Sequence, residues 1–494
     1  MSALGLGRVG YYSLMLLVFI QITKINTYQI PDITINVFKP KGLTASMPDS
    51  PGVRLFVFQA NINRGISKSD VGTISGEVVE AKDGKWTYEN PDVVLKVGDI
   101  IYYYVFVSEN RVGYLKDRLS FTVTELEDRL GAKTDKPKVD PTTTEQPKQE
   151  ECKATVTKVR GGTACSGQVI FEENFETLRE DIWQIEQFIP IYLTEFPFVS
   201  YQRLSQDPTV SVTGGNLRIA PKLQQNLPGF NDTSIYVGSL NLFSGCTSSA
   251  DSCIKEAWGA NILPPIVTGR ITSKGFAFTY GTVQVRAKLP QGDWLYPEIL
   301  LEPFLKKYGS THFSSGVVRI ASARGNKELS NGVADYSNKV LYGGPIMDFK
   351  CHDVFLGNKI SSQQWGDDFH EYVMRWAPDR ITFSVDGQEW LRVEPAASGL
   401  SGRFPDRCDQ IPKTILGMGT KLAPFDDHFY LTLGVAAGSI TEFPDGVHTA
   451  GNRPKPWTNP SSKAMLHFWQ DMDAWLSTWN QPQMLVDYVK VLAL

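Results

Sequence analysis

The sequence lacks long apolar runs and an excess of charge of one sign. Beyond the N-terminal segment, no stretch approaches the about 18 consecutive apolar residues of a membrane-spanning helix, so no transmembrane anchor is expected. Lys and Arg total 49 against 53 Asp and Glu, a formal net charge of −4. Without a basic surface, a nucleic-acid partner is not expected either. The rest of the composition is that of an ordinary globular chain.

Sequence patterns of common metal sites and active sites are also missing. The chain has six histidines, none spaced as a pair of metal ligands: His312, His352, His370, His428, His448 and His467. No Cys-x-x-Cys pair, Gly-x-Ser-x-Gly elbow or phosphate-binding loop occurs. The sequence therefore predicts no metal and no cofactor.

The N-terminal segment has the pattern of a secretory signal. Arg8 precedes the short apolar run Leu14–Ile20, and one positive charge before a run too short to span a bilayer is typical of such signals. We assign residues 1–27 to a signal peptide cleaved near Ile25–Tyr28; a buried N-terminal helix is the alternative. The protein is then expected to be secreted and extracellular, and Asn231, in an Asn-Asp-Thr sequon, is its candidate glycosylation site.

All six cysteines follow residue 151: Cys152, Cys165, Cys246, Cys253, Cys351 and Cys408. An oxidising compartment favours disulfides. Short loops favour Cys152–Cys165 and Cys246–Cys253, which leaves Cys351 for Cys408. A zinc site is the alternative, but no Cys-x-x-Cys pair supports it.

A charged segment with three prolines divides the chain. Residues 129–151 contain almost no apolar side chain, so we expect an extended, flexible linker there. Before it, residues 28–128 contain short strand-like segments separated by turn signals, which predicts an immunoglobulin-like β-sandwich. After it, residues 152–494 form a large all-β domain with one helix predicted at Ser462–Leu476.

Four segments of the second domain carry a resemblance: Gly281–Trp294, Leu295–Pro297, Arg324–Asn326 and Ala423–Leu431. They resemble the laminarinase-like glycoside hydrolases of family 16, whose fold is a concanavalin-like β-jelly-roll and whose members cleave β-1,3-glucans. The first domain is similar to the small glucan-binding domain that arthropods fuse to such a hydrolase domain. The whole arrangement resembles the β-1,3-glucan recognition proteins, also called Gram-negative bacteria-binding proteins.

The catalytic strand of that hydrolase family has lost every carboxylate here. A retaining glycosidase needs two carboxyl groups about 5–5.5 Å apart, which the family supplies from the motif Gly-Glu-Ile-Asp-Ile-Met-Glu-Ser-Arg-Gly-Asn. In the matching segment, Gly316–Asn326, Val317 replaces the nucleophile, Arg319 the assisting Asp and Ser322 the acid/base. Because strand side chains alternate, the third position reaches the face of the first two only through a bulge. We therefore predict no hydrolase activity and no catalytic residue.

A relocated pair of carboxylates is the alternative to an inactive cleft. Glu298 and Glu302 are four residues apart and would share one face of a strand. They would lie about 13 Å apart, too far for the retaining geometry, and Arg319 or Arg324 is available to neutralise one of them. Without catalysis, Trp294 and Arg319 are the candidates for glycan contact in this cleft.

The resemblance also implies glycan-binding positions in the first domain. The relatives use an aromatic residue, an acid and an arginine, and the matching positions are Tyr104, Glu77 and Leu115. The aromatic residue is retained and an acid is present, but the arginine is missing. Lys116, one residue later, is the candidate replacement for its charge.

Three functions are compatible with these patterns. The leading hypothesis is a secreted, non-catalytic pattern-recognition protein of innate immunity that binds β-1,3-glucan, lipopolysaccharide, lipoteichoic acid or peptidoglycan. As the resemblance implies, it would trigger an extracellular serine-protease cascade of the Toll or prophenoloxidase type, with a peptidoglycan recognition protein or a modular serine protease as partner. The alternatives are an active secreted endo-β-1,3-glucanase and an extracellular adaptor that has lost glycan binding.

Overall fold

The computed structural model describes residues 28–39, 41–66, 72–91, 93–110, 112–128, 152–160, 162–193, 195–408 and 410–494. The chain divides into two compact units, residues 1–146 and 147–494. The signal peptide expected at 1–27 and the linker expected at 129–151 lie outside the described residues. Within the described ranges, no helix has the length and apolar character of a membrane span.

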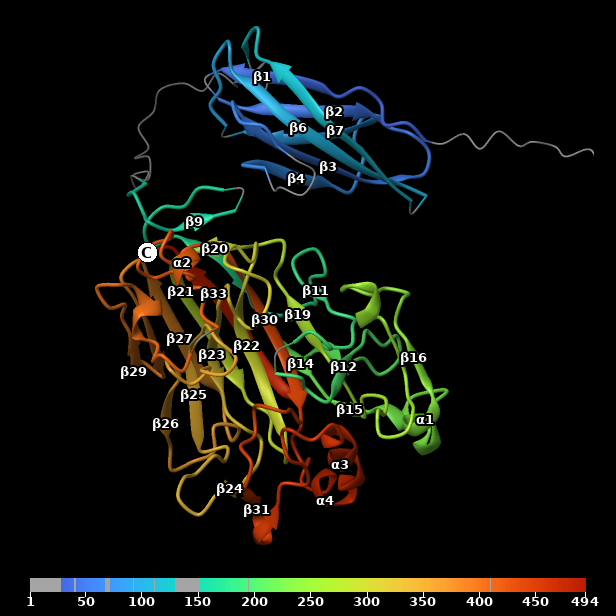
Figure 1. The fold of residues 1–494 in the computed structure, drawn as a ribbon, viewed down its shortest axis with the longest axis vertical. Helices are drawn as coiled ribbons and strands as arrows, with labels where there is room; N and C mark the ends of the chain where they lie inside the picture. The colour runs from blue at the N-terminus through green and yellow to red at the C-terminus, as the bar shows by residue number, and fades with distance from the viewer. Residues whose placement is uncertain are drawn as a thin grey trace, which may run out of the picture. The chain divides into compact units, whose positions relative to one another are not determined.

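The N-terminal unit is a β-sandwich of two four-stranded sheets (Figure 1). Their strand orders are β5-β2-β1-β8 and β4-β3-β6-β7. The strands are β1 (Thr34–Lys39), β2 (Leu43–Pro48), β3 (Val53–Ile62), β4 (Ile74–Val78), β5 (Lys85–Asn90), β6 (Ile100–Glu109), β7 (Val112–Thr122) and β8 (Glu127–Asp128). Every second side chain of β3 and β6 is buried in one apolar core, which includes Phe56, Phe58, Tyr103 and Val105. This alternation confirms the β-sandwich predicted from the sequence.

The C-terminal unit contains two large sheets around its main apolar core. The eight-stranded sheet has the order β13-β14-β33-β21-β27-β28-β29, with β10 also paired to β33. Its strands are β10 (Val169–Glu173), β13 (Val210–Thr213), β14 (Asn216–Ile219), β21 (Gly281–Lys288), β27 (His370–Ala377), β28 (Arg380–Val385), β29 (Gln388–Val393) and β33 (Met484–Leu492). On β21 the side chains alternate between buried and half-buried, as the sequence predicts for a strand with one face on the core.

The nine-stranded sheet carries the cleft of this unit. Its order is β11-β19-β30-β22-β23-β25-β26, with β20 paired to β30 and to β9. Its strands are β9 (Lys158–Val159), β11 (Gln184–Ile185), β19 (Arg270–Thr272), β20 (Phe278–Thr279), β22 (Leu295–Pro303), β23 (Val317–Ser322), β25 (Val340–Ile346), β26 (Gly357–Ile360) and β30 (Phe429–Ala437). The two sheets confirm the predicted all-β jelly-roll.

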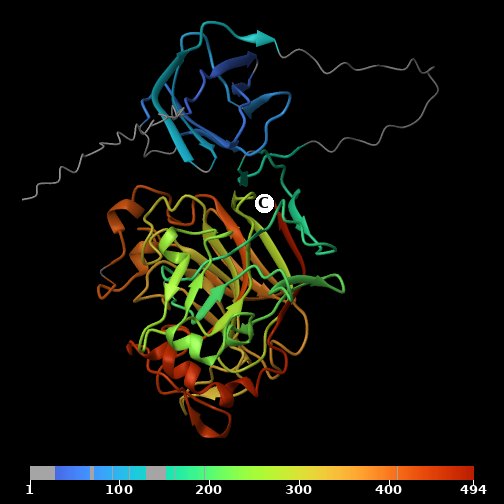
Figure 2. The same cartoon turned by 90° about the vertical axis from the view of Figure 1, so that its right-hand side faces the viewer.

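Short helices and small sheets occupy the connections, and in both views the helices lie at the periphery of the large sheets (Figure 1, Figure 2). The smaller elements are β12 (Val199–Tyr201), β15 (Lys222–Leu223), β16 (Ser239–Asn241), β17 (Ile254–Glu256), β18 (Ile266–Thr268), β24 (Leu329–Ser330), β31 (His448–Thr449), β32 (Arg453–Pro454), α1 (Asp232–Val237) and α2 (Lys413–Leu416). The helix predicted at Ser462–Leu476 is two helices, α3 (Ala464–Gln470) and α4 (Met472–Leu476). The break at Asp471 lets Trp475 stack on Phe468 with ring centroids 4.7 Å apart.

Three disulfides link the cysteines in the predicted pairs. Cys152 is joined to Cys165, Cys246 to Cys253 and Cys351 to Cys408. Their Cα–Cα distances of 5.1, 5.9 and 6.0 Å lie within the range of unstrained disulfides. The zinc-site alternative for these residues is therefore wrong.

Candidate functional site

A stripe of aromatic side chains runs along the outer side of the sheet β4-β3-β6-β7. Tyr102, Tyr104 and Phe106 of β6 alternate with its buried residues and are half-buried on this outer side. Tyr104 lies opposite Gln59 of β3, and Phe106 lies opposite Val57. The strand period therefore places Tyr104 where a ligand has access to its ring.

Glu77 and Leu115 share this outer side. Glu77 of β4 lies opposite Val57, which lies opposite Phe106, which in turn lies opposite Leu115 of β7. Glu77 is exposed, and Leu115 has 45% of its surface exposed. The three positions that the family resemblance selects thus lie on one surface. We call this surface the aromatic face, made of Glu77, Tyr102, Tyr104, Phe106 and Leu115.

Lys116 does not join the aromatic face, which corrects the expectation that it replaces the missing arginine. It lies opposite Val105, a buried residue of β6, so its side chain leaves the other side of the sheet. There its Nζ binds Asp32 Oδ1 at 2.8 Å. Leu115 and Lys116 pair in regular register with Phe106 and Val105, so strand alternation alone sends their side chains to opposite sides of the sheet.

In the C-terminal unit, the neighbouring strands β22 and β23 form the floor of the cleft. The pairing of β23 shifts register between Arg319 and Ser322, against both β25 and β22. This is the bulge that the spacing of the catalytic motif requires. Ile320 and Ala321 belong to the apolar core, so the positions of the three lost carboxylates, Val317, Arg319 and Ser322, share the side of the strand that faces the cleft.

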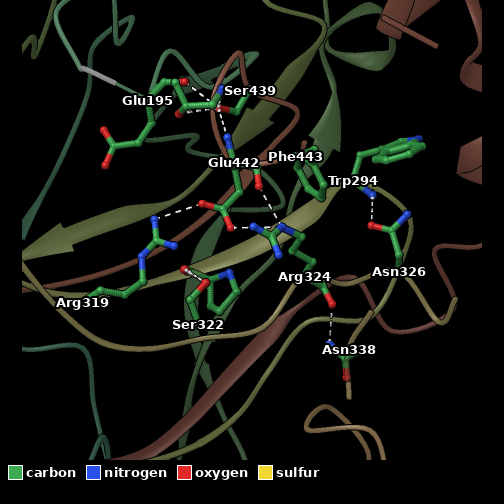
Figure 3. Close-up of polar contacts among 12 residues, drawn as sticks. Glu195, Trp294, Arg319, Ser322, Arg324, Asn326, Asn338, Ser439, Glu442 and Phe443 are labelled. Atoms are coloured by element: carbon green, nitrogen blue, oxygen red, sulfur yellow. Dashed lines mark hydrogen bonds and ion pairs between the residues drawn. The ribbon is translucent and has the colours of Figure 1, made fainter. Parts of the chain in front are cut away.

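Arg319 replaces a carboxylate of the family motif and is neutralised by Glu442. Its Nη2 donates to Glu442 Oε2 at 2.9 Å, and Arg324 donates its Nε to the backbone oxygen of Glu442 at 2.8 Å. Figure 3 shows the two guanidinium groups on either side of the Glu442 carboxylate. Burial raises the pKa of Glu442, but the two arginines outweigh this effect and hold the pKa below its usual value. Glu442 therefore acts as the shared counterion of the cleft.

Glu298 and Glu302 share one side of β22, as predicted, but a third arginine neutralises them. Arg270 of β19 lies with its Nε 3.6 Å from Glu298 Oε2 and its Nη2 2.7 Å from Glu302 Oε2. Burial raises the pKa of Glu298, which also accepts a hydrogen bond from the Tyr201 hydroxyl. For Glu302, burial is outweighed by Arg270 and by a hydrogen bond from Thr432, so its pKa is lowered. Both carboxylates are thus held in structural interactions.

Glu195 is a cleft carboxyl group that sequence reasoning missed. It precedes β12 in an irregular segment, and its backbone oxygen accepts a hydrogen bond from Ser439 Oγ at 2.6 Å (Figure 3). Burial raises the pKa of Glu195 to about 7, although the charge of Arg319 opposes the shift. No motif surrounds this residue, so no sequence signal identifies it; only the folded loop brings it to the cleft.

Two pockets open on the cleft, and Glu195 and Phe313 line both. The first, the acidic pocket, is lined by Arg270, Glu298, Glu302 and Val317 and has a volume of about 100 Å³. The second, the arginine pocket, is lined by Arg319, Arg324, Tyr342, Phe349, His352 and Glu442 and has a volume of about 320 Å³. Since ligand pockets span about 300–1,000 Å³, the arginine pocket reaches the size of a small-ligand site and the acidic pocket does not.

Trp294 is a core residue, which corrects its assignment as a glycan contact. Only 1% of its surface is exposed. Its ring packs edge-on against Phe443 and Trp457, with centroids 5.3 and 5.1 Å away. Its backbone N–H donates to Asn326 Oδ1 at 3.1 Å, which fastens the loop before β22 to the segment after β23. Trp294 therefore stabilises the wall of the cleft and has no surface for a sugar.

Two further sequence predictions concern modification and metal binding. Asn231 is exposed at the N-terminus of α1, where its Oδ1 accepts from the backbone N–H of Ser234 at 3.0 Å. Its glycosylation stays a prediction. Among the residues that the structure describes, no group of three or more His, Cys, Asp or Glu side chains is placed to hold a metal ion.

Comparisons with known families match both units. The model of a carbohydrate-binding domain (family 32), CBM39, matches residues 29–150, and that of glycosyl hydrolases family 16 matches residues 356–424. Among solved structures, the laminarinase catalytic domain of Thermotoga maritima covers 66% of this chain and 98% of its own, at 16% identity and a TM-score of 0.40.

Named relatives match almost the whole chain. A beta-1,3-glucan-binding protein of Hyphantria cunea is 70% identical over 97% of this chain and 98% of its own length. Beta-1,3-glucan-binding protein 1 of Galleria mellonella is 35% identical over 95% of this chain and 97% of its own. Gram-negative bacteria-binding protein 1 of Drosophila melanogaster is 34% identical over 94% and 96%. The chain therefore belongs to the family of β-1,3-glucan-binding and Gram-negative bacteria-binding proteins.

Proposed function

We propose that this chain is a secreted pattern-recognition protein of innate immunity that binds microbial wall polysaccharide, first of all β-1,3-glucan, without hydrolysing it. The names of its relatives support the class of ligand. The carbohydrate-binding domain matched over residues 29–150 supports the N-terminal unit as the binding module. Lipopolysaccharide, lipoteichoic acid and peptidoglycan are the other ligands to be tested.

The aromatic face is the observation that carries this proposal. Its three rings offer apolar surfaces on which sugar rings stack, and the exposed carboxylate of Glu77 accepts hydrogen bonds from sugar hydroxyls. An open sheet surface suits a long polymer better than a small molecule. Leu115 lacks the charge-assisted hydrogen bond of an arginine, which is worth about 1.5–3 kcal/mol. We therefore expect each sugar to bind weakly. Several sugars of one polymer, bound together, should restore a high overall affinity.

The absence of hydrolysis is supported by the chemistry of the cleft floor. Valine has no nucleophilic atom, the Arg319 guanidinium does not give up its proton near neutral pH, and a serine hydroxyl is a poor general acid. Glu298 and Glu302, the carboxylates of β22, are bound by Arg270, and Glu442 is bound by Arg319 and Arg324. The cleft thus retains the walls of a glycosidase without its reacting groups.

Signalling is the remaining part of the proposal. The bound protein would trigger an extracellular serine-protease cascade, with a peptidoglycan recognition protein or a modular serine protease as partner. The relationship to Gram-negative bacteria-binding proteins supports this role. Its test is glucan-dependent protease activation in cell-free body fluid, expected with the native chain and lost with Tyr104→Ala.

The binding site is tested by co-sedimentation of the full-length protein with curdlan, an insoluble β-1,3-glucan. Tyr104→Ala should weaken binding about tenfold, and Leu115→Arg should strengthen it by a similar factor. Trp258→Ala, which removes an aromatic residue with 71% of its surface exposed in the other unit, is the matched control and should bind as the native chain does. Native binding by folded Tyr104→Ala would overturn the assignment of the aromatic face.

A further inference from the structure

The arginine pocket contains guanidinium groups whose hydrogen-bonding capacity the protein does not exhaust. Arg319 and Arg324 each use one nitrogen on Glu442. Nη1 of Arg324 is buried and has no hydrogen-bond partner. The two residues retain only 9% and 8% of their surface, so bulk water supplies few acceptors. A guanidinium carries five N–H donors in a fixed fork, and Nη1 of Arg324 is a donor for which the described residues supply no acceptor.

The charges around the pocket leave an excess of positive charge inside it. Two guanidinium groups face one buried carboxylate, that of Glu442. Glu195 is the second carboxyl group of the lining, and its raised pKa keeps it largely uncharged in mildly acidic solution. His352 also lines the pocket, and Asp353 is exposed at the rim, where solvent screens its charge. Of the carboxylates on β22, Glu298 and Glu302 share Arg270, and the charge of Arg319 also acts on Glu298.

Aromatic side chains surround these donors. The Arg324 Cζ lies 4.6 Å from the centroid of the Tyr342 ring, which holds the guanidinium plane in a fixed orientation. Phe313 and Phe349 complete the aromatic part of the lining. A fixed guanidinium fork matches two oxygens of a carboxylate or phosphate, and aromatic surfaces beside it match the apolar side of a sugar ring. The lining thus combines the two elements of a site for a charged sugar.

We propose that the arginine pocket is a second ligand site of this protein and binds the carboxylate or phosphate group of an acidic sugar through Arg319 and Arg324. The site is separate from the aromatic face, which belongs to the other unit. A neutral glucan has no group that offsets the excess positive charge, so the two sites select different polymers. This inference goes beyond the proposed glucan recognition and does not depend on it.

The test measures binding of small monosaccharides to the full-length protein by calorimetry at pH 6. Methyl β-D-glucuronide and glucose 6-phosphate are the acidic probes, and methyl β-D-glucoside is the neutral probe. The acidic probes should bind at least tenfold more tightly than the neutral one, and the stronger of the two identifies carboxylate or phosphate as the preferred group. Equal affinity of the acidic and neutral probes would overturn the proposal.

The residue assignment is tested with Arg324→Gln, which leaves the Arg319–Glu442 pair in place. It should reduce the affinity for the acidic probes about tenfold or more and leave curdlan binding unchanged, so that the two sites are distinguished. The matched control is Arg286→Gln, which removes an arginine paired with Asp487 on the eight-stranded sheet. Native affinity in Arg324→Gln, or an equal loss in Arg286→Gln, would overturn the assignment.

A pH series adds an independent readout. As pH rises from 6 to 8, Glu195 ionises, so affinity for the acidic probes should fall. Glu195→Gln should retain most of the pH 6 affinity at pH 8, and His352→Gln serves as the comparison because it changes another side chain of the same lining. If the affinity of Glu195→Gln for the acidic probes falls between pH 6 and 8 as much as that of the native chain, Glu195 does not have this role in the pocket.

Discussion

Arg319 places a positive charge where the motif of the hydrolase family has a carboxylate, and Glu442 binds this charge. A buried guanidinium without a partner is costly, and removing one partner of a buried ion pair costs about 3–5 kcal/mol. Glu442 supplies the partner from the loop after β30 and binds Arg324 as well. Arg319, Arg324 and Glu442 therefore form a buried ion-pair network in the cleft.

Glu195 should make the protein less stable as pH rises. Its pKa of about 7 in the folded protein lies above the ordinary glutamate value of 4.5. The stabilisation of the protonated form is therefore fully present below pH 4.5 and is lost as pH rises through 7. A shift of this size corresponds to about 3 kcal/mol. In Glu195→Gln the free energy of unfolding, measured in urea from pH 5 to 8, should decline less than in the native chain.

The control for this prediction is Glu176→Gln, which removes an exposed carboxylate of the same unit. Its pH profile should follow that of the native chain. Parallel profiles for native and Glu195→Gln would show that the raised pKa of Glu195 has no bearing on stability.

At the scale of the element, features that depend on local sequence spacing are predictable, and features that depend on contacts between distant residues are not. The strands follow from side-chain alternation and the first two disulfides from short loops, whereas Cys351–Cys408 follows by elimination and the jelly-roll and the bulge in β23 from the family resemblance. Glu442 and Glu195 reach the cleft on distant loops, so no spacing in the sequence connects them to Arg319. The continuous amphipathic pattern concealed the helix break at Asp471. The sequence predicts Trp294 as a glycan contact, but the ring lies in the core, because Phe443 and Trp457, which pack against it, are far away in sequence.

The start of β23 gives a prediction at this scale. Gly316 has a φ of +75°, and a Cβ added to it would lie 2.5 Å from Phe425 Cε1 and 2.9 Å from Pro424 Cγ. Gly316→Ala should therefore cost about 2–4 kcal/mol, from left-handed backbone strain and overpacking together. Gly332 has a φ of +83° but open space around it, so Gly332→Ala isolates the backbone strain at about 1–2 kcal/mol. Equal losses in urea unfolding would show that the contact with Phe425 is not limiting.

At the scale of the whole molecule, the two units present side chains of different chemistry. The N-terminal unit presents rings and a carboxylate on an open sheet, which suits a neutral polymer. The C-terminal unit presents a cleft with buried arginines, in which each described carboxylate of the floor has a cationic partner. The two proposed ligand sites differ in chemistry, and the proposed function requires that neither unit cleaves what it binds. Hydrolysis would release the polymer that the protein detects.

The full-length protein should accordingly produce no reducing ends from laminarin. Retaining hydrolysis requires a nucleophile and an acid/base about 5–5.5 Å apart, and Val317 and Ser322 occupy those positions. The measurement is a reducing-sugar assay over a day at pH 5 to 8, with an active laminarinase as positive control and Glu298→Gln as the matched variant. Native and Glu298→Gln should both remain at background, because Arg270 and Tyr201 hold Glu298 in structural contacts. Turnover that is present in the native chain and absent in Glu298→Gln would show that catalysis has moved to β22, since this variant removes the carboxylate and preserves its shape.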